Sequence, residues 1–384
     1  MTDREKIQKA FAPLHASDTA VQEVLEMAEH RNTHTIKKSS RTILIAAVIA
    51  VLLIGTALAV TYSAWSPGLQ SRLQLSDEEA AALEDTELVS IPAVSDTHDG
   101  VTVSIEKAVV NGDTAILGLR IDGMDIPEGY TLAWGEPDLT IDGDRAPGWF
   151  IGVYEGLHWD GKRFVYDDGT PAPLDEEGYP IPRIVREDGS VELDVSITGL
   201  GDLDTLVGKE ITLTVYRLGT VQLGIDPKTA EYTAEGPWVL SWTAEGAEND
   251  RTWMLDAPLG HGITLTSVKL SMLSAHIEYE YPPLTIVGDH AYDADGNELL
   301  EEPPEPYKII LKDGTEYIAF FGAGTGGPDA DNLSDLEKGF TYKADMELTR
   351  IIDPDEVAAL VFRETVLGDD PDSEVEFYTV TLPE

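Results

Sequence analysis

The stretch VTVSIEKAVVNGDTAILGLRIDG (101–123) decides the fold class of this chain. Apolar and polar residues alternate along it on both sides of the dipeptide Asn111-Gly112. A period of two is typical of a β-strand with one buried face, and Asn-Gly between two such runs is a strong signal for a tight hairpin turn. The stretch therefore predicts two antiparallel strands joined by a short turn.

Asp-Gly dipeptides punctuate the chain beyond residue 87 in the same way. Short alternating runs between such turns favour antiparallel sheets over a parallel α/β arrangement. We therefore expect a mostly β protein built from antiparallel, immunoglobulin-like β-sandwich domains. The dipeptides begin at Asp99, Asp122, Asp142, Asp160, Asp168, Asp188, Asp295 and Asp313.

The hairpin stretch has a counterpart in GITLTSVKLSMLSAHIEYEY (262–281). With Gly100 included in the first copy, each copy begins with Gly and carries a lysine seven residues later, Lys107 in the first and Lys269 in the second. A repeat of roughly 130–150 residues suits two tandem domains. We predict a first β-sandwich at 87–248 and a second at 249–384. The alternative is a chance similarity between two amphipathic hairpins.

An apolar run precedes the β region. Ile43 to Val60 contains no charged residue, and a helix over 42–62 is about as long as a bilayer core is thick. Lys37, Lys38 and Arg41 stand just before it, which predicts a cytoplasmic N-terminus and an extracellular C-terminus. A cleaved signal peptide is the alternative, but a leader of some forty residues is too long for one. We expect a single-pass cell-membrane protein.

The segment 63–86 is predicted to be a juxtamembrane helical linker. Ser76 begins an S-x-x-E pattern with Glu79, which is the signature of a capping box at a helix N-terminus. An Ala-rich turn follows it. We interpret this segment as a spacer helix that leads away from the membrane.

Charge is divided unevenly along the chain. The net charge is −45, yet residues 1–41 carry seven Lys or Arg and six Asp or Glu, so the remainder carries −46. A field this negative excludes nucleic acid and anionic lipid as partners of the exported part.

The chain has no cysteine, which removes disulfides, thiol catalysis and Cys-ligated zinc from consideration.

No pattern in the sequence specifies an enzyme, a cofactor or a metal. A G-x-G-x-x-G match at Gly322, Gly324 and Gly327 is followed by Pro328 where a phosphate loop needs a helix N-terminus. A calcium-loop beginning at Asp293 lacks the required later ligands, and the histidines beyond the apolar run show no zinc spacing. We expect no enzymatic activity, no cofactor and no metal site.

Aromatic residues gather in a long interruption of the first domain, 144–182. Aromatic rings among turn residues form platforms for carbohydrate or peptide ligands. They also serve as small cores beneath long loops, and both interpretations stay open. The residues of this candidate platform are Trp149, Tyr154, Trp159 and Tyr166.

The cytoplasmic segment 1–41 shows two amphipathic helical patterns. Their apolar stripes consist of Ile7, Phe11 and Leu14 in the first helix and of Val21, Val24 and Leu25 in the second. Two short helices cannot bury a sufficient core, so we expect these residues to bind a protein partner. A passive tail is the alternative.

The pattern HAS-x-x-T-x-x-E-V-L in the leader, with Ser17, Thr19, Glu23, Val24 and Leu25, resembles a family of Gram-positive single-pass membrane proteins. Their β-rich ectodomain is catalogued as domain of unknown function 4179, and they are described as anti-sigma factors. The resemblance implies that the cytoplasmic helices bind a sigma factor and that the acidic ectodomain senses an extracellular cue. The runner-up is a surface-anchored, non-enzymatic binding or structural module that contacts the cell wall.

Overall fold

The computed structural model describes the ranges 65–84, 86–159, 162–175, 178–198, 204–224, 227–287, 290–292, 303–320, 325–328, 338–364 and 376–383. They belong to the compact unit Tyr62–Glu384. The predicted cytoplasmic helices and the predicted membrane span at 42–62 lie outside these ranges. Within them, no helix is both long enough and apolar enough to cross a bilayer.

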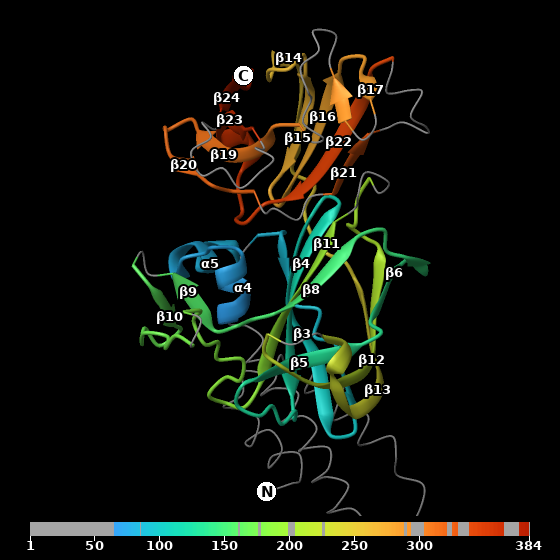
Figure 1. The fold of residues 1–384 in the computed structure, drawn as a ribbon. Coiled ribbons are helices and arrows are strands. Elements are labelled where there is room, and N and C mark those ends of the chain that lie inside the picture. Colours follow the sequence, from blue (N-terminus) through green and yellow to red (C-terminus); the bar gives the residue numbers. More distant parts are fainter. Residues whose placement is uncertain are drawn as a thin grey trace, which may run out of the picture. The chain divides into compact units, whose positions relative to one another are not determined.

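The described chain is mostly β, and its sheets are antiparallel, as the alternating sequence pattern predicts (Figure 1). We call strands β1 to β13 the first lobe and strands β14 to β24 the second lobe. Each lobe has its own hydrophobic core. The limits predicted for two tandem domains stay a prediction.

The first lobe has a six-stranded sheet in the order β1-β3-β4-β11-β8, with β2 paired to β3, and a five-stranded sheet in the order β13-β12-β6-β7, with β5 paired to β12. A separate pair joins β9 and β10. The elements are β1 (Val89–Ser90), β2 (Ser95–His98), β3 (Val101–Asn111), β4 (Thr114–Asp122), β5 (Tyr130–Gly135), β6 (Asp138–Ile141), β7 (Asp144–Arg145), β8 (Trp149–Val153), β9 (Leu157–Trp159), β10 (Phe164–Tyr166), β11 (Val191–Thr198), β12 (Glu210–Gln222), the 3-10 helix η2 (Pro227–Thr229) and β13 (Glu231–Thr243).

The second lobe has a five-stranded sheet in the order β14-β15-β16-β22-β21 and a four-stranded sheet in the order β20-β19-β23-β24, and β17 pairs with β18. Its elements are β14 (Asp250–Pro258), β15 (Thr264–Ser271), β16 (Ser274–Tyr281), β17 (Thr285–Val287), β18 (His290–Tyr292), β19 (Glu305–Leu311), β20 (Glu316–Tyr317), β21 (Thr325–Pro328), β22 (Phe340–Glu347), the 3-10 helix η3 (Pro354–Glu356), β23 (Val357–Arg363) and β24 (Phe377–Thr381).

Each core is built from residues of both large sheets of its lobe. In the first lobe, Ile105 and Leu117 of one sheet and Leu213 and Leu240 of the other belong to one buried cluster. Trp238 is fully buried there, and its indole Nε1 donates to the carbonyl of Val101 at 2.9 Å. Burying the indole thus leaves its polar atom satisfied, which burial of a tryptophan requires.

The two stretches compared in the sequence form corresponding hairpins. Strand β3 pairs with β4 up to Asn111 and Thr114, and β15 pairs with β16 up to Leu270 and Ala275. Each ladder also contains one register irregularity, which is the sign of a β-bulge. The hairpin predictions are confirmed at both positions.

The linker at 63–86 contains two short helices, α4 (Pro67–Arg72) and α5 (Asp77–Leu83), of which the sequence predicts only the second. The capping box of Ser76 and Glu79 is present at the start of α5. However, the linker does not act as a free spacer. Leu69 and Leu73 are buried, because α4 packs into a third hydrophobic cluster that we call the junction core.

The junction core joins both lobes. Its buried members are Leu69 and Leu73 from α4 and its C-cap, Leu88, Val109 and Ile116 from the first lobe, and Leu273 from the turn between β15 and β16. Close packing of such apolar side chains is the main source of stability in a protein interior. The linker is therefore a structural part of the compact unit.

The expected interruption at 144–182 is only partly an insertion. Residues 149–153 form β8, which pairs with β11 and extends the six-stranded sheet of the first lobe. The physical reason is that Ile151 is buried in the first core, with Trp149 and Val153 packed against that core on the same face. The β9–β10 pair and the loops that follow make up the true insertion.

Candidate functional site

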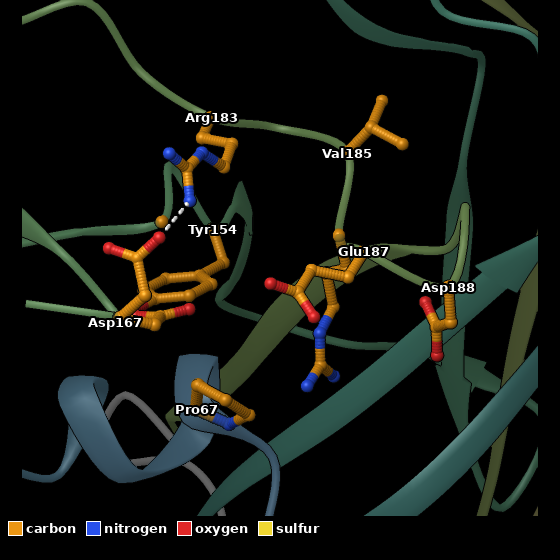
Figure 2. Close-up of a pocket in the computed structure, with 10 residues that line it drawn as sticks. Pro67, Tyr154, Asp167, Arg183, Val185, Glu187 and Asp188 are labelled. Carbon is orange, nitrogen blue, oxygen red and sulfur yellow. Dashed lines mark hydrogen bonds and ion pairs between the residues drawn. The ribbon is translucent and has the colours of Figure 1, made fainter. Parts of the chain in front are cut away.

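A pocket of about 330 Å³ opens beside helix α4 in the first lobe. Figure 2 shows the side chains of Tyr154, Arg183 and Glu187 around one hollow, with Pro67 on its helix beside them. A volume near 300 Å³ is at the lower end of the range for small-ligand sites. The lining residues are Pro67, Tyr154, Gly156, Asp167, Asp168, Arg183, Val185, Arg186, Glu187 and Asp188.

Tyr154 forms one wall of the pocket directly after strand β8. Its backbone N–H donates to the carbonyl of Glu192 at 3.0 Å, which continues the pairing of β8 with β11 by one residue. Its hydroxyl donates to Asp167 Oδ1 at 2.5 Å. Burial, together with the neighbouring Asp167 carboxylate, raises the pKa of the Tyr154 hydroxyl, so it remains a neutral hydrogen-bond donor.

Arg183 lines the pocket next to Tyr154 and is held from two sides. Its Nη1 donates to Asp168 Oδ2 at 2.9 Å, and its guanidinium carbon lies 3.9 Å from the ring centre of Tyr166. Asp168 also accepts from Thr170 Oγ1 and from Arg183, which lowers the pKa of its carboxyl. The guanidinium is thus fixed by an ion pair and a cation–π contact.

The backbone approaches closely at this wall. Gly156 has a positive φ of 64°, and a Cβ placed on it would lie 2.6 Å from the carbonyl oxygen of Arg183. The amide of Arg183 also donates to the carbonyl of Glu155 at 2.8 Å. Only glycine fits both the left-handed backbone and the narrow gap.

Arg186 connects the pocket to helix α4. It forms an ion pair with Glu192, a side chain that is almost fully buried. The other oxygen of the Glu192 carboxylate accepts the backbone N–H of Gly68, in the first turn of α4, at 2.8 Å. A Cβ on Gly68 would lie 2.6 Å from that same carboxylate oxygen. A pocket residue and the helix therefore share one buried carboxylate.

Asp188 closes the far end of the pocket with Arg120 from strand β4. Its Oδ2 lies 2.9 Å from Arg120 Nη2. Burial raises the pKa of Asp188, but hydrogen bonds from Ser190 and Arg120 outweigh it and lower that pKa to about 2. Arg120 is also 4.0 Å from Glu106, a buried carboxyl whose pKa is raised by burial.

The pocket therefore presents fixed charges of both signs. Four carboxylates and two guanidinium groups line it, and most of these groups already have a partner of opposite charge. Charged side chains that are already held in place by ion pairs can bind a small polar ligand reversibly through several hydrogen bonds. Within the described ranges, no group of three or more His, Asp or Glu side chains is placed to hold a metal ion.

The structure separates the four aromatic residues of the predicted platform. Tyr154 lines the pocket, and Tyr166 lies beneath Arg183. Trp149 instead packs against the first core from strand β8. The backbone of Trp159 pairs with Phe164 in the β9–β10 hairpin. The predicted partner-binding residues Ile7, Phe11, Leu14, Val21, Val24 and Leu25 lie outside the described ranges.

Sequence reasoning missed the charged half of the pocket. Asp168 and Asp188 were recognised only as parts of Asp-Gly turns, and nothing in the sequence distinguished Arg183 and Arg186 from surface residues. The aromatic residues of 144–182 were the one signal that marked this region. Pro67 could not have been placed there, because its contact depends on helix α4 folding onto the first lobe.

Comparisons with known proteins identify no family. No family model matches the chain, and no curated protein matches it. Among solved structures, the crystal structure of the conserved domain protein from Bacillus anthracis has a TM-score of 0.39 and 11% sequence identity. That match covers 77% of this chain and 90% of the other.

Proposed function

We propose that this chain is a single-pass envelope-signalling protein of the anti-sigma type. In this proposal the lobes are immunoglobulin-like sandwiches outside the cell, the span is 42–62, and the helices of 1–41 hold a sigma factor. A small polar ligand enters the pocket of the first lobe. The ligand changes the contacts of helix α4, which begins five residues after the end of the predicted span.

The observation that carries this proposal is the double role of α4. Pro67 lines the pocket, Gly68 shares the Glu192 carboxylate with Arg186, and Leu69 lies in the junction core. A ligand that competes for Arg186 would therefore change the packing of the segment nearest to the predicted membrane span. A ligand shifts an equilibrium only through such differential contacts.

The cytoplasmic part of the proposal is tested by capture of a sigma factor. The tagged full-length chain, expressed in its own host, is expected to co-purify with a sigma factor, and the double substitution Val24→Asp, Leu25→Asp to abolish this by breaking the apolar stripe. The matched control, Gln22→Asp with Asn32→Asp, adds the same charge off the stripe and should retain the partner. Equal sigma recovery from all three chains would contradict the proposal.

The alternative function is a surface-anchored binding or structural module that contacts the cell wall. The exposed apolar side chains of Phe164, Leu174 and Tyr179 in the insertion favour it, since exposed apolar groups can serve as contact surfaces. The two functions differ in their need for the leader. Deleting residues 2–30 abolishes the phenotype of a signalling protein, whereas a wall-binding module keeps its phenotype.

A further inference from the structure

The junction between the lobes contains a charged histidine that the pocket does not use. His276 lies on strand β16 of the second lobe, with about one sixth of its side chain exposed. Its Nδ1 is 2.6 Å from Asp345 Oδ1 in the same lobe, and its Nε2 is 2.8 Å from Asp113 Oδ2 in the first lobe. The Nδ1 contact is a hydrogen bond, whereas the Nε2 contact has ion-pair distance without hydrogen-bond alignment, so one imidazole ring links carboxylates of both lobes by one hydrogen bond and one ion pair.

The surroundings of His276 are defined on each side. Asp345 is its direct neighbour on strand β22, and Lys269 is its direct neighbour on strand β15. Lys269 is paired with Asp250 at 3.0 Å and is about one third exposed. Asp113 comes from the turn between β3 and β4 and is almost fully buried. Among the described residues, the ion pairs and the strand register place these charged groups around the ring.

Asp113 is held in place independently of the histidine. It accepts from Thr114 Oγ1 at 3.2 Å and from Ser274 Oγ of the second lobe at 3.4 Å. Next to it, Asn111 Oδ1 accepts the backbone N–H of Met272 at 2.8 Å, while Asn111 Nδ2 donates to the carbonyl of Ala247. The tip of the β3–β4 hairpin is therefore fixed against the second lobe by side chains.

Two carboxylates can be satisfied only by the protonated ring. A neutral imidazole has one N–H donor, so its second nitrogen would present a lone pair to a carboxylate. Burial opposes the charge, but the carboxylates of Asp113 and Asp345 outweigh burial and raise the pKa of His276 to about 9. The junction thus contains an imidazolium ion at neutral pH.

We propose that His276 is a proton-dependent latch between the two lobes. In the imidazolium form it holds Asp113 of the first lobe to Asp345 of the second. When the proton leaves to solvent, two buried carboxylates face each other across a neutral ring, which weakens the hold of the hairpin on the second lobe and raises the population of separated lobes. This regulation of the lobe junction is independent of the proposed signalling role.

The raised pKa of His276 sets the direction of the pH effect on the latch. Because the pKa is higher in the closed junction than its ordinary value of 6.5, the latch is fully closed below that value. It opens as the pH rises toward about 9. The latch therefore responds to alkaline conditions and not to acid.

The latch can be tested by measuring the distance between the lobes. Since the chain has no cysteine, spin labels can be attached to the full-length chain at Tyr216→Cys in β12 and Met254→Cys in β14, both exposed positions. We expect one narrow distance distribution below pH 6.5 and a second, broader population that grows toward pH 9. A label pair within the first lobe, Phe150→Cys with Tyr216→Cys, should not change, which separates opening from unfolding.

Three variants decide the assignment. His276→Gln is expected to show the broad population at every pH. Asp345→Asn removes one carboxylate and should lower the opening midpoint by about one pH unit. His261→Gln, a histidine that lies 2.8 Å from Glu364 within the second lobe, should behave like the parent chain.

Two results would overturn the latch. One is an interlobe distance that stays the same between about pH 6 and about pH 10. The other is a midpoint in Asp345→Asn equal to that of the parent, which would mean that another group titrates. The Asp345→Asn result decides the matter even if His276→Gln fails to fold.

Discussion

Lys107 and Lys269 are matched in the sequence repeat, but they differ in register and in surroundings. Lys107 directly follows the irregularity in its ladder, whereas Lys269 lies two residues beyond Ser267, which follows the irregularity in the other. Lys107 has only 1% of its side chain exposed, forms an ion pair with Glu84 and lies 4.9 Å from the ring centre of Trp65. Lys269 has 36% of its side chain exposed and pairs with Asp250. The first lysine therefore holds the linker, whereas the second forms an ordinary surface pair.

This difference predicts unequal costs for the same substitution. Lys107→Ala should lower the free energy of unfolding by about 2–3 kcal/mol, since it leaves a cavity and removes the cation beneath Trp65. Lys269→Ala should cost less than about 1 kcal/mol, because exposed ion pairs contribute little. Denaturant unfolding of both variants measures the two costs. If both variants lose the same free energy of unfolding, the burial of Lys107 does not contribute to stability.

His276 also predicts how stability changes with pH. Its pKa rises from 6.5 to about 9 on folding, so it contributes stability that is present in full below 6.5 and lost as the pH approaches 9. The shift corresponds to at most about 3 kcal/mol. Urea unfolding of the parent should show this decline. In His276→Gln the stability should be nearly constant over the same window, and a parallel decline in both chains would contradict the assignment.

At the level of elements, strand β13 is the edge of its sheet, and carboxylates cover that edge. Asp96 in β2 accepts the backbone N–H of Val239 at 2.9 Å, and Asp99 accepts that of Glu235 at 2.9 Å. The hydrogen bond from Val239 is the main cause that lowers the pKa of Asp96. These two amides of the edge are thus occupied and are not free to pair with another chain.

Removing this cover should promote self-association. The double variant Asp96→Ala, Asp99→Ala is expected to form larger assemblies at concentrations where the parent does not, because the amides of β13 become free to pair. Size-exclusion chromatography with light scattering measures the change. The variant Asp125→Ala, Glu128→Ala removes the same charge from exposed positions and should elute like the parent. Association of the control would attribute the effect to charge alone.

Helices and strands could be predicted from the sequence wherever residues close together along the chain specify them. The β3–β4 hairpin follows from alternation around Asn111-Gly112, and α5 follows from the Ser76 capping box. Helix α4 was missed because it has only six residues and its burial comes from distant side chains. Strand β8 was obscured by the aromatic and glycine residues around it, since only its pairing with β11 identifies it as a sheet strand.

For the whole molecule, Arg72 at the end of α4 is the point where three parts meet. It forms an ion pair with Glu347 of the second lobe, and its Nε lies 3.7 Å from Asp194 of the first lobe. Ser196 also donates to Glu347. Burial raises the pKa of both carboxyls, and the charge of Arg72 partly offsets this effect.

Loss of this cation should uncouple the lobes. Arg72→Met leaves two buried carboxylates without their cation, a loss of about 3–5 kcal/mol for a buried pair. Calorimetry should show one transition in the parent and two in the variant. Because the raised pKa values favour the protonated carboxyls, part of the deficit should be recovered as the pH falls from about 7 to about 5. A single transition in the variant would mean that the junction core alone couples the lobes.

The candidate site was less predictable than the fold, for a related physical reason. A half-buried strand shows alternating apolar and polar residues, which can be recognised in the sequence. The pocket, in contrast, is assembled from α4, the end of β8, the turn after β10 and the segment before β11, which are far apart in the sequence. Of its charged residues, Arg183 and Arg186 have no local signature. Only Tyr154 belonged to a pattern that pointed to ligand binding.

The position of α4 has a mechanical consequence. A pulling force on the N-terminal end of the compact unit reaches α4 first, where individual ion pairs and the six-residue helix yield one contact at a time. Pulling along the ladder of β3 and β4 instead requires many hydrogen bonds to break together. The junction is thus the compliant element of the unit. Because each lobe has its own core, we expect tension to part the lobes before either core unfolds.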